Sequence, residues 1–309
     1  GCRDIIRDNK EGFLVPVKDP PSLKKAMIKM LEDESLRDSM GHLARYRVVN
    51  YFSLDIVSGN YVDAYNSVLV NEIEWPKMKK MKLMYLSYVD MNETSGPSIN
   101  EGGFLRVLRE FDVDLDVITG DITSVLKTSS SSGALKKLKK IVNYIVYSFA
   151  VISLIFNKSK MANKDLVVLR LGPFPIAESM MVLFSNPKFV IKTLGSGNLS
   201  WASGNIFLDR IHLRLYAYLA RKSLMIDTVT NESMLQIREM LSDGQNLPIH
   251  VIDNGVDTNL FKFREKKCIR QEYKLDDYQY IFGYTGNFGS KRGATEAIIT
   301  AAKFNADGV

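Results

Sequence analysis

The sequence has 309 residues, of which 25% are charged and 46% are apolar, and its formal net charge is +6. This composition is typical of a soluble globular protein, and the length suits two domains that each bury a core. Because the positive charge is modest and spread along the chain, it fits phosphorylated ligands or anionic lipid and does not indicate nucleic acid.

The N-terminal residues and the cysteines predict a cytoplasmic protein. Gly1–Asp4 is polar and contains no initiator methionine, so we expect no signal peptide and a chain that is a fragment. Cys2 and Cys268 lie far apart and form no C-x-x-C pair, which supports neither a disulfide framework nor a zinc site. We therefore expect a reducing, cytoplasmic location and no bound metal.

Residues 1–70 predict a short strand, a loop and two helices. Phe13–Val15 is an apolar stretch bounded by glycine and proline, as in a short strand. A helix is expected to start at Asp19–Ser22, where two prolines and a capping side chain suit a first turn. Another helix, starting near residue 53, is expected to lie as a strap across a neighbouring domain, with an inner side formed by Ile56, Val57, Tyr61 and Tyr65.

The character of the chain changes at residues 71–81. This stretch is charged, is broken by Pro76 and contains two potential start methionines, Met78 and Met81. The apolar run Leu83–Ser87 follows directly, as expected for a first, fully buried parallel strand. Two interpretations remain open: the start of a cytoplasmic Rossmann-like protein, or a linker between ordinary domains.

Strand and helix patterns alternate from residue 83 to about residue 255. The strand candidates are Leu83–Ser87, Leu115–Thr119, Leu166–Leu171, Phe189–Thr193, Leu224–Thr228 and Ile249–Ile252. The helix candidates are residues 99–110, 134–156, 176–185, 207–222 and 232–241. This alternation predicts an α/β fold in which helices cover both faces of a parallel sheet.

The helix expected at 134–156 joins a basic start to a long apolar stretch. The apolar part, Ile141 to Phe156, is shorter than the roughly 20 residues that a spanning helix needs. It fits either a helix in the membrane interface, with lysines among anionic headgroups, or a buried helix that covers the sheet and has a solvated basic end. The lysines concerned are Lys136, Lys137, Lys139 and Lys140.

A second domain is expected to start near residue 265. Cys268–Tyr273 is predicted to be helical, Tyr280–Tyr284 to be a strand, and Ala294–Phe304 to be a helix. A glycine-rich turn, residues 286–293, separates that strand from that helix.

Three segments together resemble retaining glycosyltransferases of family GT4, which have two Rossmann-like domains in the GT-B arrangement. The glycine-rich turn resembles the one that opens the family's C-terminal, nucleotide-sugar domain. The interdomain turn Asn254, Gly255 and Asp257 is similar to the N-G-V-D passage where the family's chain leaves its first domain. The opening segment, Asp4–Val15, resembles the end of the family's C-terminal domain.

The resemblance implies a binding site for the donor diphosphate in the glycine-rich turn. Glycines allow backbone N–H groups to approach a diphosphate, and basic side chains neutralise the charge of the leaving nucleoside diphosphate. The residues concerned are Gly286, Asn287, Gly289, Lys291 and Arg292. Asn287 and Arg292 occupy places where the family usually has Arg and Lys.

The resemblance also implies an unusual domain order. Residues 1–70 correspond to the end of a donor-binding domain, 71–81 to a junction, 82–262 to a nearly complete acceptor-side Rossmann-like domain, and 263–309 to the start of a donor-binding domain. Either two neighbouring transferases have been read as one chain, which we favour, or one enzyme has been circularly permuted and cut.

Further site candidates lie in the loop after the first strand of the acceptor-side domain. In the family this loop often contacts donor phosphate and acceptor, which implies roles for Gly96, Ser98, Asn100 and Glu101. Capping of the next helix by Ser98 explains that residue equally well. His42 and His212, expected on helices, and His250, expected in a strand, are interpreted as structural. No catalytic triad or metal-ligand cluster is predicted.

The resemblance implies transfer of a sugar, with retention, from a nucleotide-sugar donor to a glycan or lipid-linked acceptor, without a separate cofactor. Polysaccharide biosynthesis at the inner leaflet of a membrane fits such partners. Because the donor side is split, we expect little or no activity from these 309 residues. An alternative is a non-catalytic, membrane-associated Rossmann-like binding module. An oxidoreductase is less well supported, because the sequence lacks a suitable G-x-G-x-x-G.

Overall fold

The computed structural model describes residues 2–70, 80–91, 96–111, 113–120, 133–172, 174–193, 205–241, 246–278, 281–285 and 295–300. The chain divides into two compact units, one formed by Gly1–Tyr51 with Thr258–Val309 and the other by Phe52–Asp257. The predicted diphosphate-binding residues Gly286, Asn287, Gly289, Lys291 and Arg292 lie outside the described residues.

The unit Phe52–Asp257 contains a six-stranded, fully parallel sheet with the strand order β2-β1-β3-β4-β5-β6. This arrangement confirms the expected α/β fold with a Rossmann-like parallel sheet. The chain direction across the sheet reverses between β1 and β3, which is the topological switch point of such folds. The strands are β1 (Met81–Ser87), β2 (Val113–Thr119), β3 (Leu166–Arg170), β4 (Phe189–Lys192), β5 (Met225–Thr228) and β6 (Ile249–Val251).

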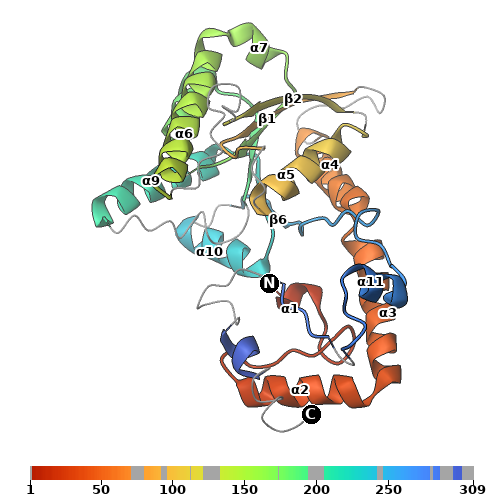
Figure 1. Ribbon diagram of the computed structural model, residues 1–309. Helices are drawn as coiled ribbons and strands as arrows, with labels where there is room; N and C mark the ends of the chain where they lie inside the picture. Colours follow the sequence, from red (N-terminus) through yellow and green to blue (C-terminus); the bar gives the residue numbers. More distant parts are fainter. Residues whose placement is uncertain are drawn as a thin grey trace. The chain divides into compact units, whose positions relative to one another are not determined.

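Helices cover both faces of this sheet, as alternating side chains of the strands require. Met84 and Leu86 of β1 belong to one buried cluster, whereas Leu83 and Tyr85 belong to the other. The first cluster is completed by α6 (Gly133–Phe156), α8 (Ile176–Ser185), α9 (Ile206–Lys222) and α10 (Asn231–Leu241), with the short α7 (Lys158–Ala162) between α6 and β3. The second is completed by α4 (Leu54–Val70) and α5 (Gly96–Leu108). Figure 1 shows α6 and α9 on one side of the strands and α4 and α5 on the other.

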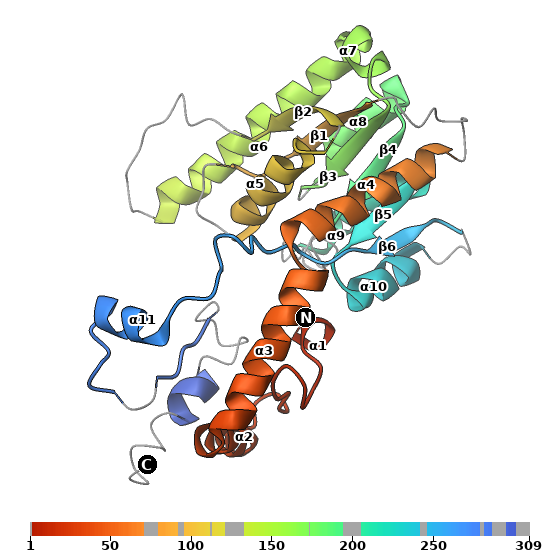
Figure 2. The ribbon, with the colours of Figure 1, turned by 90° about the vertical axis from the view of Figure 1, so that its right-hand side faces the viewer.

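Helix α4 is the strap that the sequence predicted, and Figure 2 shows it lying across the strands. Its residues Val57, Tyr61 and Tyr65 are buried in the core against the sheet. The expectation for Ile56 was wrong: this side chain is 38% exposed, because it lies one position before Val57 and so points away from the sheet. The helix start is fixed by backbone bonds from Leu54 N to Val256 O, 3.0 Å, and from Val256 N to Phe52 O, 2.7 Å.

The other unit is mainly helical in its described part, with α1 (Cys2–Ile5), α2 (Pro20–Glu32), α3 (Glu34–Tyr51) and α11 (Lys266–Glu272). Asp19 caps α2 by accepting from the backbone N of Ser22, 3.1 Å, which confirms the predicted helix start. Of helix α3 the sequence predicted only that His42 lies on a helix, and not the helix's bounds. Its residues are mostly polar and only Met40 is buried, so its apolar periodicity is weak.

Two predicted strands of this unit are absent from its described residues. Phe13–Val15 is irregular, and only an isolated bridge between Asp8 and Gly12 precedes it. Residues 281–284 of the predicted strand Tyr280–Tyr284 are likewise irregular. An apolar stretch becomes a strand only when a neighbouring strand accepts its backbone hydrogen bonds, and these stretches have none among the described residues.

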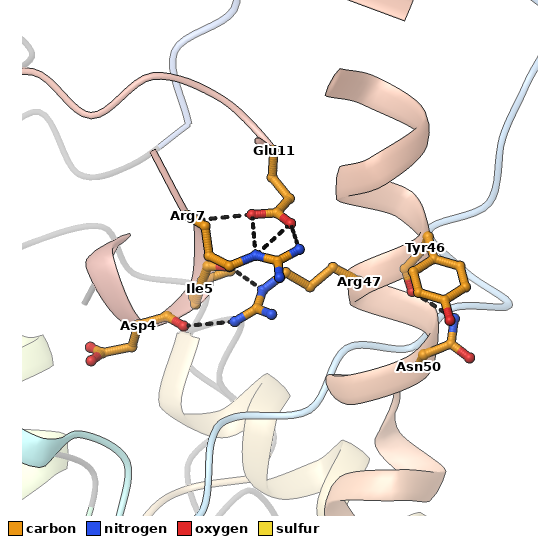
Figure 3. A network of polar contacts seen from close by, with 7 residues as sticks. All are labelled: Asp4, Ile5, Arg7, Glu11, Tyr46, Arg47 and Asn50. Atoms are coloured by element: carbon orange, nitrogen blue, oxygen red, sulfur yellow. Dashed lines mark hydrogen bonds and ion pairs between the residues drawn. The ribbon is translucent and has the colours of Figure 1, made fainter. Parts of the chain in front are cut away.

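A polar network ties the N-terminal segment to α3 (Figure 3). The Arg7 guanidinium donates to the Glu11 carboxylate, which also accepts from the Arg7 backbone N at 2.8 Å. From α3, Arg47 donates to the carbonyl oxygens of Ile5, 2.7 Å, and Asp4, 3.3 Å. The Arg7 hydrogen bonds lower the pKa of Glu11 to about 2, so this carboxyl group is ionised across the neutral range.

Candidate functional site at the carboxyl edge of the sheet

Four buried charged residues gather at the carboxyl edge of the sheet. Arg170 is the last residue of β3, Lys192 is the last of β4, and Asp227 lies one residue before the end of β5. Glu101 joins them from the first half of α5. None of the four is more than 4% exposed. In open parallel sheets, ligands bind at this edge near the switch point, so the placement of these four residues marks a candidate functional site.

The four charges form two pairs that tyrosines complete. Glu101 forms an ion pair with the Arg170 guanidinium and accepts a hydrogen bond from the Tyr85 hydroxyl. Lys192 Nζ lies 3.8 Å from Asp227 Oδ1, and the Tyr65 hydroxyl donates to Asp227 Oδ2 at 3.0 Å. Tyr65 comes from the strap α4, so the strap takes part in the polar contacts of the site.

Burial alters the ionisation of the second pair. Burial lowers the pKa of Lys192, and the neighbouring Asp227 carboxylate opposes this shift. Burial raises the pKa of Asp227 to about 6, although Lys192 and the Tyr65 hydrogen bond act in the opposite direction. The Lys192 ammonium also lies over the ring of Tyr61, 3.5 Å from its centroid, and over that of Phe104, 4.4 Å from its centroid. These rings compensate for part of the water that the ammonium has lost.

The edge also contains buried polar atoms that lack a hydrogen-bond partner among the described residues. They include Arg170 Nε and the hydroxyl oxygens of Thr193 and Thr228. Thr193 directly follows β4, and Thr228 ends β5, so these atoms lie at adjacent strand ends. Buried donors and acceptors are normally satisfied by protein, water or ligand, which makes this edge suited to a polar ligand.

A small cavity of about 20 Å³ lies beside the cluster, between α4, α5 and the loop after β6. Such a volume holds about one water molecule. Its polar lining comes from Ser58, Glu101, Lys192, Asp253 and Asn254. The side chains of the strap, among them Tyr61, fill the space next to it.

A second polar group lies on the loop after β1, around Asp90. The Asp90 carboxylate accepts from Asn143 Nδ2 at 3.0 Å and pairs with Lys139 Nζ at 3.1 Å, both from α6. The Asp90 carbonyl oxygen accepts from the Ser98 hydroxyl at 2.8 Å. Ser98 lies inside the first turn of α5, which begins at Gly96, so the idea that Ser98 caps this helix was wrong. The hydroxyl instead fixes the loop that leads into the helix.

The predicted loop and turn residues fall close to this site. Glu101 is at its centre, and Gly96, Ser98 and Asn100 lie in the first turns of α5. In the interdomain turn, Asp257 pairs with Arg106 of α5 at 2.6 Å. A Cβ atom on Gly255 would lie 2.8 Å from Leu54 Cδ2 and 3.0 Å from Leu54 Cα, so the strap requires a glycine there. Asn254 lines the small cavity.

The predicted basic residues of α6 serve different purposes. Lys139 is partly buried in its ion pair with Asp90, whereas Lys140 is exposed. Lys136 and Lys137 lie within α6 as expected. Helix α6 covers the sheet on one side, as the second interpretation of this helix predicted, and exposes apolar side chains on the other. The membrane-interface interpretation stays a prediction.

Sequence reasoning missed Arg170, Lys192 and Asp227 as functional candidates. A signal was present: each is a charged residue at or next to the end of an otherwise apolar strand. In a parallel sheet such positions converge on one edge.

A larger cavity of about 730 Å³ belongs to the other unit, between α2, α3 and α11. Its walls are mostly apolar, with Phe13, Met27, Met30 and Ile269 among them. The guanidinium of Arg37, which lines it, donates to the carbonyl oxygens of Met30 and Leu31. Glu34, Lys266 and Arg270 also line it, so the cavity combines apolar walls with charged residues.

The described part of the chain contains no group of three metal-binding side chains. His42 lies on α3, His212 on α9 and His250 on β6, so the predicted elements for all three histidines are confirmed. Among the described residues, none of the histidines belongs to the charged cluster at the carboxyl edge.

Comparison with known proteins gives a similarity over part of the chain. A stretch of 69 residues, 22% of this chain, is 35% identical to the capsular polysaccharide biosynthesis glycosyltransferase CapM of Staphylococcus aureus. The match covers 18% of that protein's length. No protein-family model matches the chain. The partial similarity and the fully parallel α/β sheet are consistent with a glycosyltransferase fold and support glycosyl transfer at a general level.

Proposed function

We propose that this protein is a retaining glycosyltransferase of the GT4 type, which transfers a sugar from a nucleotide-sugar donor to a glycan or lipid-linked acceptor. The observation that carries the proposal is the buried Glu101–Arg170 and Lys192–Asp227 cluster at the carboxyl edge beside the switch point. Burying four charges is expensive, and ionisable groups with strongly perturbed pKa values cluster at functional sites. The partial similarity to a capsular polysaccharide glycosyltransferase supports the same chemistry.

In this proposal the residues position substrates and stabilise charge, and no separate cofactor takes part. Arg170 Nε and the Thr193 and Thr228 hydroxyls offer hydrogen bonds to phosphate oxygens. Asp253 and Asn254, which line the small cavity, offer hydrogen bonds to sugar hydroxyls. Lys291 and Arg292 of the glycine-rich turn neutralise the departing nucleoside diphosphate. Positioning and electrostatic stabilisation of this kind supply most of the rate enhancement in comparable group transfers.

Calorimetric titration with a panel of nucleotide sugars tests the proposal. Binding is the readout, because we expect little or no turnover from these 309 residues alone. At least one donor is expected to bind with a dissociation constant between about 1 μM and 1 mM, the usual range for enzyme substrates. Lys291→Gln with Arg292→Gln is expected to weaken it at least tenfold, whereas Lys24→Gln with Lys25→Gln, the matched control on α2, leaves it unchanged. The absence of saturable binding by every donor would contradict the proposal.

One observation favours a second candidate, a non-catalytic binding module that associates with membranes. The cavity at the carboxyl edge holds about one water molecule, whereas pockets for small ligands usually measure about 300–1,000 Å³. If the strap α4 keeps the edge closed, the unit has no room for a nucleotide sugar. The same titration separates the two candidates, because the binding module predicts no heat of binding with any donor.

A further inference from the structure

The outer faces of α6 and α8 expose rows of large apolar side chains. On α6, Tyr147, Val151 and Leu154 pack against the sheet, whereas Ile141 and Phe149 on the opposite side are 58% and 69% exposed. Helix α8 repeats this arrangement. Its buried face is Ala177, Met181 and Val182, and its exposed apolar residues are Ile176, Met180, Leu183 and Phe184.

These rows lie on neighbouring helices. Helices α6 and α8 pack against each other, α8 packs against α9, and all three contribute to the same buried cluster on the same side of the sheet. The first turn of α9 adds Ile206 and Phe207, both of which are exposed. Single exposed apolar residues are common on soluble proteins, but an apolar surface shared by three neighbouring helices marks a place of interaction.

The exposed charges of α6, α7 and α8 have one sign, whereas the first turn of α9 adds the half-buried Asp209. Helices α6 and α7 contain no acidic residue, and the only acidic residue of α8, Glu178, is fully buried. Exposed lysines lie at both ends of α6: Lys140 near its start, and Lys158 and Lys160 in the adjoining α7. An apolar surface with a basic border is complementary to a membrane that carries anionic lipid.

We infer that the outer face of α6 and α8, extended by the first turn of α9, binds the surface of an anionic lipid membrane. Lysines at the border contact the headgroups, while the exposed apolar side chains enter the upper acyl region. The inference is independent of glycosyl transfer, because it rests on a surface that contains none of the four charged residues of the carboxyl edge.

The packing of α6 indicates a helix that lies on the membrane and does not cross it. Residues Leu138–Phe156 are long and apolar enough to cross a bilayer by length and composition. However, Tyr147 and Val151 are fully buried against the sheet, and Asn143 donates to Asp90. Crossing would remove this helix from the core. A second copy of the chain is a poor occupant of the same surface, because two such faces would bring their lysines together.

Co-sedimentation with phosphatidylcholine vesicles, with and without phosphatidylglycerol, tests the inference. The protein is expected to bind the vesicles that contain phosphatidylglycerol and to be released by high salt. Lys140→Gln and Lys158→Gln are each expected to weaken binding roughly fivefold. Phe149→Ser with Phe184→Ser is expected to weaken it at least tenfold. The matched controls are Lys262→Gln and the double variant Phe261→Ser with Phe263→Ser, which change exposed residues of the other unit.

Three results would overturn the inference. The first is the absence of binding to phosphatidylglycerol vesicles by a protein whose circular dichroism shows it to be folded. The second is equal loss of binding in the surface variants and their controls. The third is retention in the membrane after extraction with alkaline carbonate, which indicates a spanning helix. A dimer in solution that Phe149→Ser with Phe184→Ser dissociates, without any binding to vesicles, would assign the surface to self-association instead.

Discussion

Lys192 Nζ and Asp227 Oδ1 lie 3.8 Å apart at the ends of two adjacent parallel strands, and neither side chain is more than 4% exposed. This pair connects the sheet to the strap, because Tyr65 of α4 donates to the same carboxylate and the ring of Tyr61 covers the ammonium. The carboxyl edge, which is the candidate functional site, is therefore also the point where the strap is held.

Removal of one member of this pair is expected to destabilise the protein strongly. Lys192→Met leaves the Asp227 carboxylate buried without its counter charge, which costs about 3–5 kcal/mol of unfolding free energy. The double variant Lys192→Met with Asp227→Leu is expected to have a free energy of unfolding closer to that of the original protein, because no uncompensated charge remains. Urea unfolding at neutral pH measures both. Lys266→Ala, which removes an exposed ion pair with Asp38, should change the free energy of unfolding little. Equal losses in the single and double variants would show that the pair is not coupled.

The buried Glu178 carboxyl group is expected to make stability depend on pH. Burial raises its pKa from 4.5 to about 7, against the opposing effect of the neighbouring Tyr147 hydroxyl. The folded state therefore binds the proton more tightly than the unfolded state, and stability falls as the pH rises from about 4.5 to about 7. The loss is about 3 kcal/mol for this one group.

Glu178→Gln tests this dependence through the difference between two stability curves. Unfolding free energies of the variant and the original protein are measured from pH 4 to pH 8 at about equal spacing. The variant is expected to gain stability relative to the original protein as the pH rises through this range. Asp227 remains present in both proteins and cancels from the difference. Parallel curves would show that Glu178 does not titrate in the folded state as its burial requires.

Glu11 is expected to show the opposite dependence. Its pKa is lowered to about 2 by the Arg7 hydrogen bonds, so its contribution is complete above about pH 4.5 and is lost as the pH falls toward 2. Glu11→Gln should expose the N-terminal segment to hydrogen exchange at neutral pH. It should have little effect near pH 2, where the original carboxyl group is itself protonated. Unchanged exchange of residues 2–12 in the variant at neutral pH would contradict this role.

Two glycines with different surroundings provide a matched pair of substitutions. Gly255→Ala places a Cβ atom 2.8 Å from Leu54 Cδ2 and 3.0 Å from its Cα, so the start of the strap must shift. We expect a loss of about 1–3 kcal/mol. Gly41→Ala, inside α3 with no atom within 4 Å of the new Cβ, should stabilise by about 0.5–1 kcal/mol. Thermal unfolding of both variants measures the contrast, and a stabilising Gly255→Ala would rule out the close approach.

The strap also predicts that the sheet depends on a segment from before residue 71. Val57, Tyr61 and Tyr65 of α4 fill the core between the strap and β1. Residues 80–309 expressed alone are therefore expected to aggregate, and co-expression with residues 1–70 should restore a soluble complex. When the chain of residues 1–70 carries Tyr61→Ser with Tyr65→Ser, it should no longer rescue residues 80–309. Tyr46→Ser, which changes an exposed residue of α3, should leave the rescue intact. Soluble, folded 80–309 without its partner would contradict the dependence.

Much of the sheet was predictable, because its strands are buried apolar runs whose limits are marked by polar or turn-forming residues. Helix α8 begins and ends at the residues that its periodicity predicts, Ile176 and Ser185. The other unit was less predictable, since Phe13–Val15 resembles a strand locally but has no neighbouring strand among the described residues. Backbone pairing is a property of tertiary structure, and a single stretch of sequence does not contain it.

The candidate site shows the same limit. Glu101 was implied by the family resemblance, which gives roles to the loop after the first strand, and the structure places it in α5 within the charged cluster. The sequence did not point to the other three members of the cluster, because their proximity depends on the order β3-β4-β5 within the sheet. These are Arg170, Lys192 and Asp227. Their common signal, a charge that ends an apolar strand, becomes informative only when those strands are known to be neighbours.

Hydrogen exchange with and without the tightest-binding nucleotide sugar tests most directly whether the carboxyl edge is a glycosyltransferase site. We predict slower exchange in the loop after β1, in the first turns of α5 and in residues 168–172 and 190–193, where Arg170 and Lys192 lie. The amides in the C-terminal halves of α6 and α8, which lie away from the carboxyl edge where both helices start, should be unaffected. Protection confined to α6 and α8, or no protection in a protein that remains folded, would contradict the proposed site.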